Sequence, residues 1–120
     1  MRWLKLLLVC VLMAWTSLNT LGSSQHKGAA ASINLSISAA AEAGNVVVVI
    51  VAIDNVQTTD GNTSEVISIS DSGGGNTWIK AREFCNGQGG GAAGATVSVW
   101  YSKLTNAIAS GGTIAASLSS

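Results

Sequence analysis

The stretch Ser64-Glu-Val-Ile-Ser-Ile-Ser-Asp-Ser-Gly-Gly-Gly-Asn-Thr-Trp78 decides the fold. Its first half alternates apolar and polar residues, a pattern that is typical of a β-strand with one buried face. Its second half, Asp71 to Asn76, is polar and rich in glycine, which predicts the turn of a β-hairpin. Trp78 then begins the next strand. The sequence therefore predicts β-structure on both sides of this turn.

The rest of the chain continues the pattern. Val46 to Ile53 is an unbroken apolar run, mostly β-branched, which predicts a central strand buried on both faces. The expected strands cover residues 33–38, 46–53, 66–69, 77–84, 96–101 and 113–118. Short strands at regular spacing, with no convincing helix after residue 22, predict an all-β fold. We expect an antiparallel sandwich of the immunoglobulin-like or jelly-roll type.

Residues 1–22 differ in composition from the rest. Arg2 and Lys5 flank the start of an apolar run from Leu4 to Trp15, and small polar residues follow it. A positive start, an apolar core and a polar exit are the features of a secretory signal. We therefore expect a hydrophobic, signal-like helix over residues 1–22, followed by one β-sandwich domain over residues 23–120.

Two alternatives stay open for the N-terminal segment. Cleavage of the signal would fall after Gly22 or Ser24. If the segment is not cleaved, residues 3–18 would anchor the chain in a membrane. A helix of that length measures about 24 Å, which is short of the roughly 30 Å that a hydrocarbon core requires. Alternatively, the segment is an aberrant start that precedes a domain beginning near Leu21.

Composition limits the possible functions. Charged residues make up only 10% of the chain, the formal net charge is zero and no basic cluster follows residue 5, so no nucleic-acid partner is expected. Cys10 lies in the signal-like segment, which leaves Cys85 alone in the domain and excludes an internal disulfide. No cluster of His or Cys predicts a metal site, and no cofactor is expected.

No set of residues predicts catalysis. Ser70-Asp-Ser-Gly-Gly74 is similar to the nucleophile segment of chymotrypsin-like proteases, and His26, Asp54 and Ser72 occur in that family's order. The intervals between them are too short for the two barrels of those enzymes. Asp71 is instead expected to cap its own turn. The acidic residues between Asp54 and Asp71 offer oxygen ligands for calcium but lack the 12-residue spacing of an EF-hand, so we expect a solvated loop. From the sequence as a whole, we expect no enzyme.

Four segments together resemble a known family. They are residues 44–52 (Gly-Asn-Val-Val-Val-Val-Ile-Val-Ala), 69–78 (Ile-Ser-Asp-Ser-Gly-Gly-Gly-Asn-Thr-Trp), 97–101 (Val-Ser-Val-Trp-Tyr) and 111–114 (Gly-Gly-Thr-Ile). In this order they resemble a β-sandwich family of bacteriophage virion and tail-associated proteins and of bacterial secreted proteins. Gly112 replaces the family's usual acidic residue and the later strands are lacking, so the resemblance implies a truncated member. Since known members are mostly structural, it implies a non-catalytic function.

One strand predicts an exposed aromatic side chain. We expect Val97, Val99 and Tyr101 to face the core, which would point Trp100 outward. An exposed Trp marks a contact surface, covered by a neighbouring sheet or subunit or used as a stacking platform for a glycan.

The last strand, residues 113–118, predicts a second contact surface. Nothing follows it to pair with and it has neither charge nor Pro, so we expect an edge strand whose Thr113 and Ile114 dock on another chain. The sequence thus favours a structural or adhesive virion component (tail, fibre or decoration) that associates with other subunits or its own copies. The alternative is a secreted bacterial module that binds a carbohydrate or a surface. The expected location is accordingly a virion or the extracellular space.

Overall fold

The computed structural model describes residues 19–55, 60–61, 65–87 and 94–119. These residues form the strands β1 (Ser32–Ser36), β2 (Val46–Asn55), β3 (Val66–Asp71), β4 (Ile79–Asn86), β5 (Gly94–Lys103) and β6 (Thr113–Leu118). The expected strands and the all-β class are confirmed for this part of the chain. It holds no helix with the length and hydropathy that a membrane crossing needs. The signal-like helix expected over residues 1–22 falls mainly on residues 1–18, outside the described residues.

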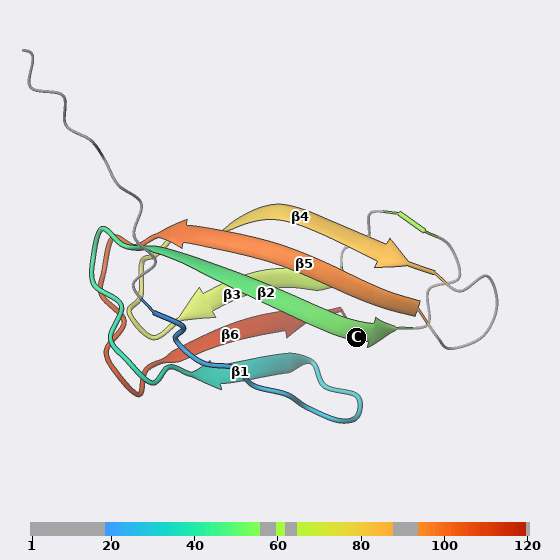
Figure 1. The fold of residues 1–120 in the computed structure, drawn as a ribbon, viewed down its shortest axis with the longest axis horizontal. Coiled ribbons are helices and arrows are strands. Elements are labelled where there is room, and N and C mark those ends of the chain that lie inside the picture. Colours follow the sequence, from blue (N-terminus) through green and yellow to red (C-terminus); the bar gives the residue numbers. More distant parts are fainter. Residues whose placement is uncertain (1–18, 56–59, 62–64, 88–93, 120) are drawn as a thin grey trace, which may run out of the picture.

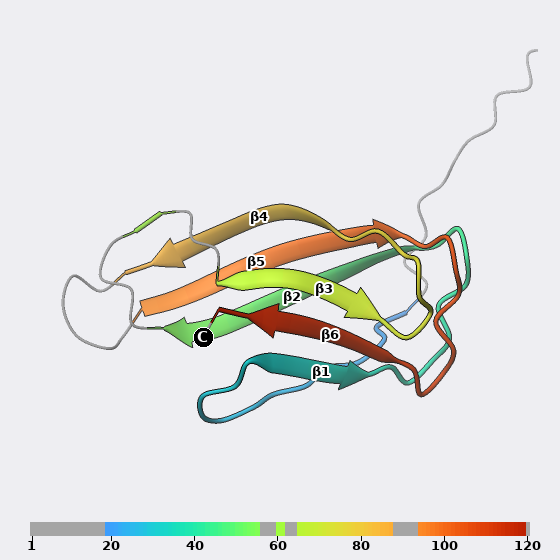
Figure 2. The same ribbon diagram turned by 180° about the vertical axis from the view of Figure 1, so that it is seen from behind.

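The strands form two antiparallel sheets that face each other as a sandwich (Figures 1 and 2). One sheet has the order β1-β6-β3 and the other the order β2-β5-β4. β4 and β5 are neighbours both in the chain and in a sheet, whereas β3 and β4 lie in different sheets. The hairpin expected at Asp71 to Asn76 is therefore wrong. The glycine-rich turn instead carries the chain from one sheet to the other.

The core lies between the two sheets. Strands bury alternate residues, most regularly in β5. Reciprocal backbone hydrogen bonds of 2.9 Å between Ala41 and Ile108 fix the loops that lead into β2 and β6, so that these loops also contribute to the core. The buried apolar residues are Ile37, Ala41, Val47, Val51, Val66, Ile69, Trp100, Leu104, Ile108, Ile114 and Ala116.

β2 is an edge strand rather than the central, doubly buried strand that its composition predicts. Among the described strands it pairs with β5 alone. Val47 and Val51 point into the core, whereas Val48 and Ile50 are 59% and 68% exposed. An unbroken apolar run shows that both faces of a strand are apolar, but it does not show that both are covered.

β6 is the central strand of its sheet, which corrects the prediction of an open edge at residues 113–118. β1 pairs with β6 on one side and β3 pairs with it on the other. Ile114 is buried and Thr113 is half-buried, so the docking surface expected there is wrong as well. The reason is that strand order in a sheet is not strand order in the chain, and two earlier strands close on this one. Its small, uncharged side chains suit a position with neighbours on both sides.

Candidate functional site

The inner face of β5 carries a polar layer around one large aromatic ring. Thr96, Ser98 and Ser102 point inward and are fully buried, together with Trp100, which is 6% exposed. Trp100 Nε1 donates a hydrogen bond of 2.8 Å to Ser98 Oγ. The prediction that Trp100 points outward is therefore wrong. The strand alternates as expected, but its two faces are reversed: the buried indole has a hydrogen-bond partner in Ser98, and the Val97 side faces outward.

A bulge in β4 places a charged pair on the same inner side of this sheet. The register of β4 against β5 shifts between Lys80 and Arg82. In a regular strand, residues three apart point to opposite faces, but the extra residue of a bulge returns them to the same face. Lys80 Nζ consequently lies 3.0 Å from Glu83 Oε2. The Lys80 ammonium is also 5.1 Å from the centre of the Trp100 ring, within cation–π range.

Glu83 connects the two sheets. It is 4% exposed, and its carboxylate accepts hydrogen bonds from the backbone N–H groups of Glu65 (2.7 Å) and Val66 (3.3 Å). Because Val66 begins β3, these bonds close the side of the sandwich where β3 faces β4. The bonds and the lysine partner compensate the charge, which would otherwise be costly to bury.

Asp71 organises the turn between β3 and β4. Its Oδ1 accepts hydrogen bonds from Gly73 N at 2.9 Å, Gly74 N at 3.2 Å and Asn76 Nδ2 at 2.9 Å. Its Oδ2 accepts a bond of 2.7 Å from Trp78 Nε1. The expectation that Asp71 caps its own turn is confirmed. This carboxylate thus fixes the point where the chain crosses between sheets.

The outer face of the β2-β5-β4 sheet is largely apolar, and its charged residues include Arg82, opposite Val99, and Lys103, opposite Val46. Val48 lies opposite Tyr101, Ile50 lies opposite Val99, and Tyr101 lies opposite Ile79 on its other side. Directly opposite residues point to the same face of a sheet, so these side chains form one surface. We call the following residues, which are 39% to 68% exposed, the outer apolar face: Val46, Val48, Ile50, Ile79, Phe84, Val97 and Tyr101.

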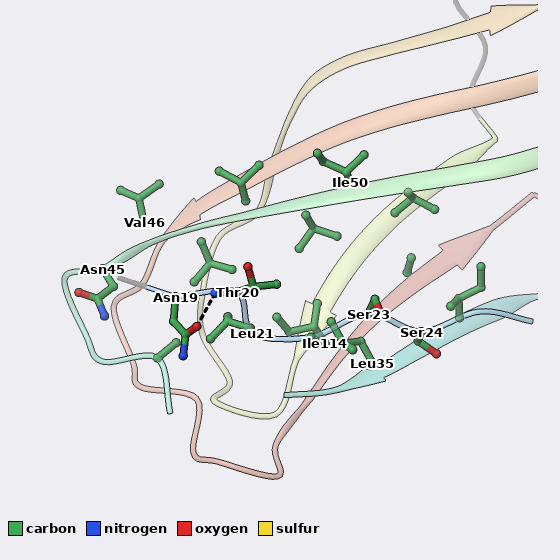
Figure 3. Close-up of a pocket in the computed structure, with 18 of the residues that line it drawn as sticks. Asn19, Thr20, Leu21, Ser23, Ser24, Leu35, Asn45, Val46, Ile50 and Ile114 are labelled. Atoms are coloured by element: carbon green, nitrogen blue, oxygen red, sulfur yellow. Dashed lines mark hydrogen bonds between the residues drawn. The ribbon is translucent and has the colours of Figure 1, made fainter. Parts of the chain in front are cut away.

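A groove runs along the opposite side of the sandwich from Glu83, between β1 and the outer edge of β2. Its volume is about 1220 Å³. Figure 3 shows Leu21, Leu35 and Ile114 in the space between β2 and β1. Lys103 is the one charged residue among the described residues that line it. The groove therefore suits apolar side chains better than a charged ligand.

The residues expected to form a contact surface do not meet on the surface. Trp100 and Ile114 come together in the buried core, and Thr113 is half-buried in β6. Sequence reasoning missed the outer apolar face because it assigned Val97 and Tyr101 to the core. The signal that points to it is the run in β2, which is apolar on both of its faces.

Comparisons with protein-family models, with curated proteins and with solved structures find no match to this chain. Within the described residues, no group of three or more His, Cys, Asp and Glu side chains could hold a metal ion. Ser72, from the protease-like segment, accepts a hydrogen bond of 2.9 Å from Thr113 N through its Oγ. The outer apolar face and the groove beside β2 are the candidate functional features, because both present apolar side chains to a partner.

Proposed function

We propose that this chain is a non-catalytic structural or adhesive β-sandwich that assembles with further protein subunits, its own copies first, through the outer apolar face. The observation that carries this proposal is the exposure of the face, in which Ile50 at 68% and Val48 at 59% are the most open residues. Monomeric proteins rarely expose a contiguous apolar patch larger than a few hundred Å². Contact with another subunit is a common way in which such a patch is covered.

The expected strength of this contact is moderate. Complete burial of an aliphatic side chain contributes about 1.5–3 kcal/mol. The residues of the outer apolar face are each about half exposed, so covering all of them would contribute roughly 5–10 kcal/mol. Association costs on the order of 4–15 kcal/mol in lost freedom. One such contact supports weak association, and repetition or a second contact would make the assembly stable.

The resemblance described above supports a virion component, such as a tail, fibre or decoration subunit, as the setting of this assembly. A charged fraction of 10% suits subunits that pack closely. The way in which consecutive strands are distributed between the sheets favours a jelly-roll-type sandwich within that family. The first four strands alternate between the two sheets, with β1 and β3 in one and β2 and β4 in the other. In immunoglobulin domains, several pairs of consecutive strands share a sheet.

A second candidate is an exported bacterial module that binds a surface, and the signal-like composition of residues 1–22 favours it. Its partner would bind the same outer apolar face. A glycan platform at Trp100 has no support, since that ring is buried.

Sedimentation velocity tests this proposal over a range of low to high micromolar concentrations. The sample is the full chain after any processing of its signal-like segment by the expression host. The wild type should form oligomers. The variant V48T/I50T/V97T should be monomeric with an unchanged circular dichroism spectrum, because it keeps β-branched side chains but loses apolar surface. The matched control S68T/S70T, on exposed positions of β3, should associate like the wild type. A monomeric wild type, or oligomers unaffected by the triple change, would contradict the proposal.

A further inference from the structure

β2 presents a long open backbone edge. Its 10 residues pair with β5 on one side, and none of the described strands pairs with the other side. Edge strands are normally short or protected by charges or Pro. β2 carries one charge, Asp54 near its end, and Val46 to Ile53 contains neither charge nor Pro. The sequence thus leaves this edge open to pairing with another strand.

The two sides of the sandwich are built differently. On the β3–β4 side, the Glu83 carboxylate binds backbone N–H groups at the start of β3 and closes the space between the sheets. On the β1–β2 side, the groove of about 1220 Å³ stays open, and residues 46–52 line it. Leu21, which also lines it, is fixed on the β1 side, where its carbonyl oxygen accepts a hydrogen bond of 2.8 Å from Ser38 N. The side of the sandwich that is suited to an added strand is therefore the side of β2.

We infer that β2 pairs with β2 of a second copy, antiparallel about a two-fold axis, so that two β2-β5-β4 sheets become one continuous sheet. This inference rests on the proposed function, since it assigns the first contact of the same assembly to another copy. Each copy contributes the same strand, as in the symmetric interfaces that dominate among oligomers. Residues 46–53 carry no charge, so the two copies do not repel each other along this edge.

The geometry of a sheet also brings apolar side chains over the groove. Adjacent strands of one sheet direct corresponding side chains to the same face. Val47 and Val51 of each copy would therefore extend over the mouth of the other copy's groove, which residues 46–52 line. The merged sheet also joins the two outer apolar faces into one surface for the next subunit.

The expected number of hydrogen bonds in this contact falls within the range of typical protein interfaces. Antiparallel strands make about one hydrogen bond per residue, so pairing over residues 46–52 gives roughly seven bonds between the chains, within the typical 10 ± 5. The paired segments would extend about 23 Å at ~3.3 Å per residue. Hydrogen bonds along the edge and apolar contact over the groove would thus add to the moderate contribution of the outer apolar face.

A cysteine scan on the full chain carrying Cys10→Ser tests the inference. Val46, Val48, Ile50 and Ala52 are replaced by Cys one at a time, and the disulfide-linked dimer is quantified after mild oxidation. In a two-fold antiparallel pair, the residue on the axis meets its own copy. A residue two positions away lies about 13 Å from its copy, beyond the roughly 7 Å that a disulfide spans. We expect a maximum at the scanned position on the axis. If the axis passes through an unscanned residue, its two scanned neighbours lie about 8 Å from their copies, so they should share a lower maximum, with several-fold less dimer elsewhere.

Val99→Cys, on the outer side of the central strand β5, is the matched control. A maximum within β2 supports edge pairing. Dimers through Val99→Cys with no maximum in β2 would overturn edge pairing but leave the proposed packing of outer faces intact. Equal yields along β2 would also overturn edge pairing. A protein that forms no disulfide-linked dimer and sediments as a monomer would overturn both proposals.

Discussion

Replacing Glu83 by Gln tests whether one buried carboxylate holds the two sheets together. An amide offers a single acceptor oxygen, so only one of the backbone N–H groups now bound at 2.7 and 3.3 Å keeps its partner. Leaving a buried N–H unpaired costs about 1–3 kcal/mol, and loss of the acceptor's charge weakens the remaining bond by roughly 1 kcal/mol. Loss of the ion pair with Lys80 adds little to this cost, because the lysine side chain is 29% exposed and its ammonium group can be hydrated. We therefore expect a loss of about 2–4 kcal/mol from a total of roughly 5–15 kcal/mol.

Urea unfolding followed by tryptophan fluorescence measures this loss, because Trp100 is buried beside the Lys80–Glu83 pair. With a slope of about 1–1.5 kcal/mol per molar urea, the midpoint should fall by roughly 2 M. Arg82→Gln, at an exposed neighbour in the same strand, is the matched control and should change stability by less than about 0.5 kcal/mol. Equal midpoints for Glu83→Gln and the wild type would refute the idea that this carboxylate joins the sheets.

Three further predictions concern β2, β5 and the turn after β3. Val47→Asp should prevent folding, because Val47 is 7% exposed and the charge would be buried. Val48→Asp, on the exposed face of β2, should keep the wild-type circular dichroism spectrum and weaken association in sedimentation. Equal effects of the two variants would contradict the assignment of Val47 to the core and of Val48 to the surface. Ser102→Ala should be neutral or stabilising in urea unfolding, because this buried hydroxyl has no hydrogen-bond partner among the described residues. Ser98→Ala should cost about 1–3 kcal/mol, because it removes the acceptor of a buried indole N–H, and equal midpoints for the two Ser variants would refute this contrast. Gly73→Ala should lower the melting temperature by about 8 °C, because the new Cβ would lie 2.6 Å from the backbone carbonyl oxygen of Ala107. An unchanged melting temperature in calorimetry would disprove that clash.

The strands could be located from the sequence because alternation and turn residues are local signals. Their order in the sheets could not, because it depends on pairing between distant segments. Residues 113–118 read as an open edge from their place in the chain, yet β1 and β3 pair with them on both sides. The turn at residues 71–76 was located correctly, but a turn signal does not state whether the chain returns to the same sheet or crosses to the other.

Which face of a strand points to the core was harder to predict than the two-residue alternation of its side chains. In β5, the Val97 side and the Trp100 side alternate equally well, so the pattern fixes two faces without stating which one is inside. In the structure the Trp100 side lies inside, and Val97 and Tyr101 are exposed. The bulge in β4 could not be predicted, because it is defined by the register against β5. Without it, Lys80 and Glu83 would point to opposite faces and the charged pair would not form.

The same choice of faces produces both the polar interior and the apolar exterior of this sheet. Turning β5 over would bury Val97 and Val99, but it would expose the Trp100 ring and separate the indole from Lys80. With the ring inside, valine and tyrosine of β5 must face outward beside β2, which is apolar on both faces. Single exposed hydrophobic residues are ordinary, but Val48, Tyr101 and Ile79 lie opposite one another across three strands and form a larger apolar surface, beside which Arg82 lies opposite Val99. Water contact with that surface disfavours the isolated subunit until a partner covers it, which is why we propose assembly, rather than binding of a small ligand, as the function.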